Sequence, residues 1–309
     1  MALTRRRALI AKEETTEGVN ASPSGVNDGI VIRDLEISVE SDDVEREIAT
    51  PWLGANKVIY TKRQAVFNFD VEIAGSGTAG TPPAWGRLIK ACGFSETIVS
   101  NTVVYSPVSS GFSSLTIAGN QDGIQYIGLG SRGSFEINFE QAEVGLFSFE
   151  FMGAYVTPAD VVLPTPTYAN QAEPLHFASG NTTNFLLDGY SFCFGGFSLD
   201  LGNEMTFRDL PNCAKRNVVT QRVVEGEIMV ERPDTLAAKN LYPKIEAHTT
   251  VATSFSHGTT GGNIIDISLP SIQLAFPEND DDDGILMQNY AFRGIPTGSG
   301  NNEIVITCR

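Results

Sequence analysis

The chain of 309 residues is 41% hydrophobic and 19% charged, so it can bury a sizeable core, has a length typical of about two domains, and is too apolar for a wholly disordered chain. Acidic residues number 37 and basic residues 21, and the formal net charge of -16 argues against a protein that binds nucleic acid by neutralising its phosphates. No apolar run approaches the roughly 18 residues of a membrane-spanning helix, so no membrane partner is expected.

The N-terminus and the cysteines carry no sorting or metal-binding signal. Only four apolar residues follow the basic residues 5–7, fewer than the roughly 7 that a secretory signal needs, so we expect no signal peptide and an intracellular origin. The cysteines lack the close spacing of a metal or redox motif and are expected to be buried, reduced thiols. They are Cys92, Cys193, Cys213 and Cys308.

The first part of the chain alternates between polar stretches and strand patterns. Residues 1–29 are polar with little periodicity, which predicts an extended N-terminal arm outside the core. Leu35, Ile37 and Val39 alternate with polar residues and predict a strand with one wet face. Residues 41–62 are predicted to form a long loop, and within it the apolar residues 51–54 are surrounded by charges. Alternation returns over residues 67–73 and predicts a second strand.

A short helix is predicted over residues 83–92. Apolar side chains recur there at i, i+3, i+4 and i+7 from Trp85, which assigns Trp85 to the core, and Gly93 follows as a stop. Phenylalanine and isoleucine alternate with polar residues over 135–140 and 147–151 and predict a hairpin. Residues 30–156 are therefore predicted to form a β unit with one short flanking helix.

A proline-rich linker at residues 157–185 is predicted to lead into a second β unit at residues 186–309. This half has alternating strands at 197–201 and 224–230 around a polar loop at 202–220, a helical segment opened by Pro233 that ends before Pro243, and further strands at 265–276 and 303–307. The repeated order of strand, long loop, strand, helix and strands predicts an internal duplication. Unrelated antiparallel proteins also follow this order, and that alternative stays open.

Two sequence motifs resemble ligand-binding sites but lack the required context, and no known catalytic motif is present. Residues 75–80 spell G-x-G-x-x-G, but prolines separate them from the helix, so we expect a flexible turn rather than a nucleotide site. Residues 279–284 have the charge of a calcium loop, but Tyr290 occupies the position of the closing glutamate, which favours a solvated acidic hairpin over a weak cation site. We expect no enzyme, no cofactor and no bound metal.

Several segments resemble the major tail tube protein of long-tailed, non-contractile bacteriophages. They are RE at residues 46–47, PWLGA at 51–55, VEIAGSGTAG at 71–80, PAWGRLIKACGF at 83–94, YSPV at 105–108 and FSLDLGN at 197–203. The resemblance implies a mainly β fold, an antiparallel β-sandwich or barrel, whose subunits form rings that stack into a tube through which the genome leaves the virion. It also implies a structural protein of the virion tail, made in the host cytoplasm, with other tail proteins as partners at the tube ends.

The alternating strands suggest how such a tube is lined. Polar side chains opposite the apolar face would face the lumen, where carboxylates repel DNA phosphates, so that double-stranded DNA passes without specific binding. The acidic lumen candidates are Glu36, Glu40, Asp70, Glu72, Glu136 and Glu140.

Rings that stack head to tail need contacts that do not close on themselves, and the loop at 41–62 and the N-terminal arm are the candidate segments. The ring-stacking candidates are Arg46, Glu47, Pro51, Trp52, Leu53 and Gly54. Trp52 either contacts a partner molecule or packs within its own loop.

Two units per chain predict a homotrimeric ring with pseudo-sixfold symmetry, with a hexamer as the alternative. Two other classes of function stay open from the residues alone. One is a surface or secreted β-sandwich that binds a partner, such as an adhesin or a carbohydrate-binding module, and the other is a β-rich hydrolase.

Overall fold

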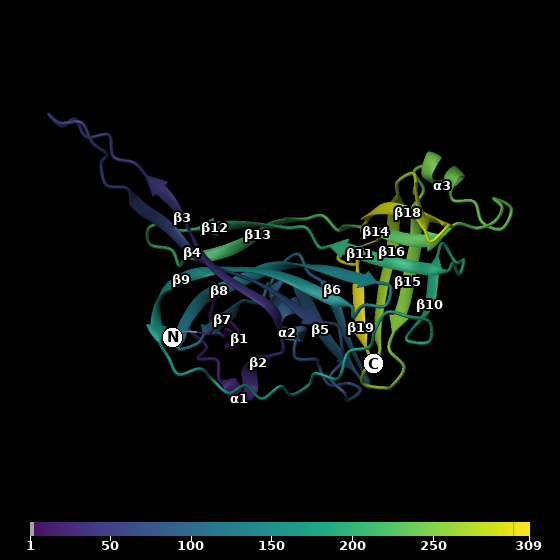
Figure 1. The fold of residues 1–309 in the computed structure, drawn as a ribbon, viewed down its shortest axis with the longest axis horizontal. Helices are drawn as coiled ribbons and strands as arrows, with labels where there is room; N and C mark the ends of the chain where they lie inside the picture. Colours follow the sequence, from purple (N-terminus) through teal and green to yellow (C-terminus); the bar gives the residue numbers. More distant parts are fainter. Residues whose placement is uncertain (1–2, 299) are drawn as a thin grey trace.

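The computed structural model describes residues 3–298 and 300–309 and consists mainly of antiparallel strands (Figure 1). The strands are β1 (Arg7–Glu13), β2 (Gly29–Ile30), β3 (Arg33–Val44), β4 (Ile59–Glu72), β5 (Phe94–Val99), β6 (Thr102–Pro107), β7 (Leu115–Gln121), β8 (Ile124–Glu140), β9 (Leu146–Asp160), β10 (Thr182–Leu187), β11 (Phe194–Asp200), β12 (Asn203–Arg208), β13 (Arg216–Arg222), β14 (Glu225–Glu231), β15 (Val251–His257), β16 (Ile265–Leu274), β17 (Glu278–Asp282), β18 (Ile285–Gly294) and β19 (Val305–Cys308). The helices are α1 (Gly25–Asp28), α2 (Gly86–Ala91) and α3 (Tyr242–Glu246). The prediction of a mainly β fold with short helices is confirmed. None of the described helices has the length and apolarity to span a lipid bilayer.

Seven strands from both halves of the chain form one continuous antiparallel array, which we call the wall. Its order is β3, β4, β9, β8, β11, β14 and β18, each hydrogen-bonded to the next. The two halves meet where β8 pairs with β11, and there Phe139 stands opposite Phe197. The predicted hairpin at 135–151 is confirmed as part of the longer pair β8 and β9.

One face of the wall is a core of aromatic side chains. The predicted alternation places every second residue of these strands on this face, including the buried Phe67, Phe135 and Phe147. Trp85 lies beneath them at the start of α2, with its ring centroid 5.0 Å from that of Phe147, and its Nε1 donates a hydrogen bond to the Ala74 carbonyl oxygen at 2.8 Å. The prediction that Trp85 belongs to the core is confirmed.

The N-terminal segment contributes a strand to the core. Ala8, Leu9, Ile10 and Ala11 of β1 are buried, and β1 pairs with β7 along its whole length. The expectation that residues 1–29 lie outside the core is therefore wrong for these four; residues 1 and 2 of that expected arm lie outside the described residues. A run of four apolar residues has no alternation from which a strand could be recognised.

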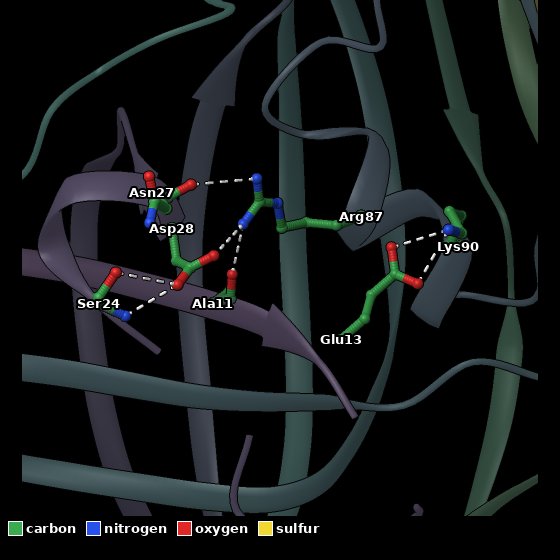
Figure 2. A network of polar contacts seen from close by, with 7 residues as sticks. All are labelled: Ala11, Glu13, Ser24, Asn27, Asp28, Arg87 and Lys90. Carbon is green, nitrogen blue, oxygen red and sulfur yellow. Dashed lines mark hydrogen bonds and ion pairs between the residues drawn. The ribbon is translucent and has the colours of Figure 1, made fainter. Parts of the chain in front are cut away.

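Charged contacts attach this segment to α2 (Figure 2). Arg87 Nη1 donates hydrogen bonds to the Ala11 carbonyl oxygen at 2.9 Å and to Asp28 Oδ1 at 3.0 Å. Lys90 Nζ contacts the carboxylate of Glu13 at 2.8 Å. The cationic side chains of α2 therefore hold both β1 and α1.

Two hairpins replace the two predicted long loops. The first loop, predicted over residues 41–62, is shorter than expected. Strand β3 extends to Val44 and β4 begins at Ile59, so only residues 45–58 connect them. The predicted loop at 202–220 is wrong, because β12 and β13 form a hairpin over the polar side of β8 and β9. Asn217 of β13 donates from Nδ2 to the Met152 carbonyl oxygen at 2.6 Å, and its own carbonyl oxygen accepts a hydrogen bond from Arg132 Nη1 at 2.5 Å.

The structure also corrects a helix and the cysteines. The helix expected after Pro233 is instead α3, with Pro243 in its first turn, where the missing amide costs no hydrogen bond. The expectation of buried thiols holds for Cys92 and Cys308 but is wrong for Cys193 and Cys213, which are exposed.

The acidic segment at 279–284 is a solvated hairpin, as predicted. Residues 279–282 belong to β17, residues 283–284 form the turn, and β18 follows; the run from Asp280 to Asp283 is exposed. Asp283 and Gly284 have φ values of +50° and +88°, as in the Asp-Gly turns that favour two-residue hairpins.

Candidate functional site

The polar face of the wall carries one row of side chains that crosses all seven strands. Residues directly opposite each other in neighbouring strands point to the same side of a sheet. The row reads, in order, Arg33, Asp70, Ser148, Glu136, Asp200, Glu225 and Arg293. It is negative in its middle and has one arginine towards each end.

Neighbouring rows add more carboxylates on the same side. Glu150 of β9 stands opposite Asn68 and Ser134, and Glu227 of β14 stands opposite Ser198. We call the resulting surface the acidic face. Its carboxylates are Asp70, Glu72, Glu136, Glu140, Glu150, Asp200, Glu225 and Glu227.

The negative charge is neutralised only towards the ends of the row. Arg293 forms an ion pair with Glu225, and Arg33 Nη1 lies 3.9 Å from Glu72 Oε1. Within residues 3–298 and 300–309, the other carboxylates of the middle rows have no cationic nitrogen within 4.0 Å. These are Asp70, Glu136, Glu140, Glu150, Asp200 and Glu227.

The negative charges of the acidic face affect the pKa of Glu136. Partial burial raises this pKa, and the negative charges of Asp200, Glu150 and Asp70 raise it further. The described residues contain no cluster of three or more His, Cys, Asp or Glu side chains that could hold a metal ion. The acidic face is therefore a broad negative surface and not a point site.

The structure brings together most of the predicted acidic residues. Asp70 and Glu72 of β4 and Glu136 and Glu140 of β8 lie on the acidic face. Glu36 is exposed at its border, opposite Asn68.

Glu40 does not lie on the acidic face. It stands opposite Gln64 of β4, beyond Val66. Val66 points to the polar side of the wall but is only 2% exposed, so this side is covered between Glu40 and the acidic face. The hairpin of β12 and β13 crosses the neighbouring strands at this level. An acidic residue on an alternating strand is therefore not enough to assign it to this face.

Sequence reasoning missed half of the carboxylates on the acidic face. Glu150, Asp200, Glu225 and Glu227 each alternate with buried apolar residues, as the predicted ones do. For Asp200, Glu225 and Glu227 the missing information was the register between β8 and β11, which aligns the second half of the chain with the first. Glu150 lies in the predicted hairpin, and its local alternation with Phe149 and Phe151 could have identified it.

The six ring-stacking candidates lie in the loop at 45–58 and are all exposed. The indole of Trp52 is 70% exposed and Leu53 is fully exposed, so packing of Trp52 within its own loop is wrong. The backbone of the loop is held by Thr50 Oγ1, which donates to the Trp52 carbonyl oxygen at 2.8 Å, and by Asn56 Nδ2, which donates to that of Ile48 at 3.3 Å. The loop projects from the body at the end of β3 and β4 (Figure 1).

A family model described as phage tail tube protein matches residues 4–294. The chain belongs to this family. No curated protein matches it in a sequence search. The protein is thus a structural component of the phage virion tail that assembles with itself into a tube, and it is not an enzyme. The adhesin and hydrolase alternatives are set aside by this result.

Proposed function

We propose that the acidic face lines the bore of the tail tube and conducts double-stranded DNA during genome ejection. The observation that carries this proposal is the row from Asp70 through Glu136 and Asp200 to Glu225, which crosses the junction between the two halves of the chain. Affinity for DNA comes largely from cations that neutralise phosphates and release counterions. A carboxylate wall offers neither, so the duplex slides without being held.

The edges of the wall support closure into a ring. Strand β3 pairs only with β4 among the described residues, so its other edge has no partner strand there. At the opposite end, the edge of β18 pairs with β16 near Arg293 and with β17 further along, and among the described residues only the outer edge of β17, over Glu278–Asp282, has no partner strand. Unpaired strand edges recruit further strands, and a closed arrangement removes them. Neighbouring chains that pair through these edges would make the bore continuous.

The two predicted units support a ring of three chains with pseudo-sixfold symmetry. Residues 30–156 contribute β3, β4, β8 and all but the last four residues of β9 to the wall, and residues 186–309 contribute β11, β14 and β18. Each unit would then act as one of six repeats around the axis, with residues 157–185 as the linker. A ring of six chains is the alternative, and reconstruction of the tubes by cryo-electron microscopy distinguishes threefold from sixfold chain symmetry.

Ring stacking would use the exposed loop at 45–58. Its large apolar side chains are unprotected in the single chain, and such exposure marks an interaction surface. Other tail proteins would meet the same surface at one end of the tube.

Retention of DNA by assembled tubes tests the lumen proposal. We expect wild-type tubes to leave a short fluorescent duplex in the supernatant after sedimentation. Tubes of the variant Glu136→Lys/Asp200→Lys should retain it and release it as salt is raised, because cations in the bore bind phosphates. The control Glu246→Lys changes an exposed carboxylate on α3, away from the acidic face, and should behave as wild type.

Two outcomes would contradict the lumen proposal. One is a reconstruction in which the acidic face lies on the outside of the tube. The other is equal retention of DNA by the lysine variant and by its control.

A further inference from the structure

We propose that residues 51–53, the tip of the loop, insert into an aromatic groove at the opposite end of the wall in a second copy of the chain in the next ring. This inference rests on the proposed ring stacking and identifies the surface that receives the tip. We call that surface the end groove, and its main residues are Phe177, Phe185, Phe192, Cys193, Phe194 and Met287.

The strand register fixes the two ends of the wall. Glu72, at the end of β4, stands opposite Leu146, beside the turn that joins β8 to β9. Gln64 stands opposite Ala154, and β4 extends further in that direction to Ile59 and the loop. The tip therefore projects from the end of the wall that is remote from the turn at 141–145.

The end groove lies at that turn. Gln141 and Ala142 line it, together with residues of β10, β11 and β18. In Figure 1 the loop projects at the upper left, whereas β10 lies at the right of the molecule. A contact between a tip at one end and a groove at the other cannot close within a pair of chains, which is the property that lets rings add one after another.

The end groove fits the tip in size and chemistry. It is a hollow of about 670 Å³, within the roughly 300–1,000 Å³ of pockets that enclose compact organic ligands. Phe185 and Phe194 stack with ring centroids 3.9 Å apart beneath the groove. Phe177, Phe185, Phe192 and Met287 are only 3–7% exposed, so the groove offers the edges of these side chains together with the half-buried Phe194 and the exposed Cys193. Pro, Trp and Leu side chains are suited to such a surface, because aromatic rings prefer stacked or edge-to-face partners.

One cationic side chain of the loop, Arg46, can meet acidic side chains at the end groove. Glu231 and Asp282 line the end groove and are exposed. Arg46, five residues before the tip, is also exposed. Arg46 would pair with these carboxylates, and the exposed Glu45 and Glu47 on either side of it would point away from the groove, which favours one orientation of the loop.

Two native cysteines make the inference directly testable. Cys193 lines the end groove and is exposed, whereas Cys213, also exposed, lies in the connection between β12 and β13. Tubes of the full chain carrying Leu53→Cys are oxidised with copper phenanthroline at pH 8.5 and analysed on non-reducing gels. We expect disulfide-linked chains that persist in Leu53→Cys/Cys213→Ser and vanish in Leu53→Cys/Cys193→Ser.

A second experiment leaves the tip of the loop unchanged. Cys193→Trp fills the end groove, and Cys213→Trp places the same bulk at the other exposed cysteine. We expect folded subunits in both, with at least a tenfold loss of polymer for Cys193→Trp alone. If Leu53→Cys does not polymerise, Ala55→Cys carries the thiol instead.

The results of these experiments distinguish a failure of this inference from a failure of the proposed ring stacking. Tubes that form but link through Cys213, or do not link at all, overturn the inference, as does equal polymerisation of the two tryptophan variants. A loop that proves dispensable for polymerisation overturns the stacking proposal itself.

Discussion

Glu136 of β8 stands directly opposite Asp200 of β11, so two carboxylates face each other where the first half of the chain joins the second. Like charges opposite each other in a sheet destabilise the pair. Partial burial and the nearby charges of Asp200, Glu150 and Asp70 raise the pKa of Glu136. The acidic face therefore weakens the fold in which it lies, as expected of a surface retained for function.

Replacing Glu136 by Gln should stabilise the isolated subunit at pH 7 by about 0.2–1 kcal/mol, since it removes one of the opposed charges. Because the folded-state pKa of Glu136 is raised above 4.5, the advantage of the variant is full above that folded pKa and disappears as the pH falls to 4.5. Urea unfolding between pH 4 and 8 measures it. The control Glu225→Gln loses its ion pair with Arg293 and should give no gain; an equal gain in both variants would argue against the pairing.

The acidic face illustrates what the sequence predicts and what it does not. Alternation assigned Asp70 and Glu136 to the wet side of their strands because side-chain direction in a strand is local. The row through Asp200 could not be predicted, because the pairing of β8 with β11 is a contact between distant parts of the chain. The hairpin of β12 and β13 was missed for a similar reason: its buried Asn217 is stabilised by hydrogen bonds with Met152 and Arg132 on other strands and not by an apolar pattern.

The two tryptophans should separate assembly from folding. Trp52→Ala is expected to leave the unfolding free energy unchanged within about 0.5 kcal/mol, because its indole is 70% exposed, and to abolish tube formation. Deleting residues 47–57 should have the same effect. Circular dichroism and denaturant unfolding check the fold, and negative-stain electron microscopy checks the tubes. Tubes of wild-type length from either variant would reject a stacking role for the loop.

Trp85→Ala should lower the stability of the fold, in contrast to Trp52→Ala. It should cost about 3–5 kcal/mol, as large-to-small changes at buried aromatic sites do, because its ring packs on Phe147 and Tyr105 and its Nε1 donates to the Ala74 carbonyl oxygen. Trp85→Phe keeps most of the packing and should cost less. Guanidinium unfolding measures both variants. A loss below 1 kcal/mol in Trp85→Ala would contradict the assignment of this residue to the core.

The contacts of Arg87 should control the order of the N-terminal segment (Figure 2). Asp28 accepts hydrogen bonds from Arg87 at 3.0 Å and from the Ser24 amide at 2.8 Å and is only 7% exposed. Asp28→Ala should cost about 1.5–3 kcal/mol, the range for hydrogen bonds to charged groups, and should speed amide exchange in residues 24–30. Glu13→Gln, at the more exposed pair with Lys90, should cost under about 1 kcal/mol. Equal exchange in the two variants would contradict the prediction.

His257 should make the subunit lose stability as the pH falls below neutrality. Its ring is buried against Phe139, its Nε2 lies 3.1 Å from the Leu175 carbonyl oxygen, and its Nδ1 lies 2.9 Å from Thr182 Oγ1. Because a carbonyl can only accept, Nε2 carries the proton and Nδ1 accepts from the hydroxyl. Burial lowers the pKa of His257; the Leu175 carbonyl partly opposes this, and His176 lowers the pKa further.

The direction of this pH dependence follows from the difference in proton binding between the folded and the unfolded chain. Below the unfolded pKa of 6.5 the unfolded chain takes up a proton that folded His257 resists, so stability falls from pH 6.5 down to the folded pKa and then levels off. His257→Gln should flatten the dependence of the unfolding free energy on pH between 5 and 7. His248→Asn, at an exposed site with φ of +54° that asparagine tolerates, is the control and should keep the wild-type slope. If His257→Gln keeps that slope as well, the pH dependence arises elsewhere, and the buried imidazole is not its source.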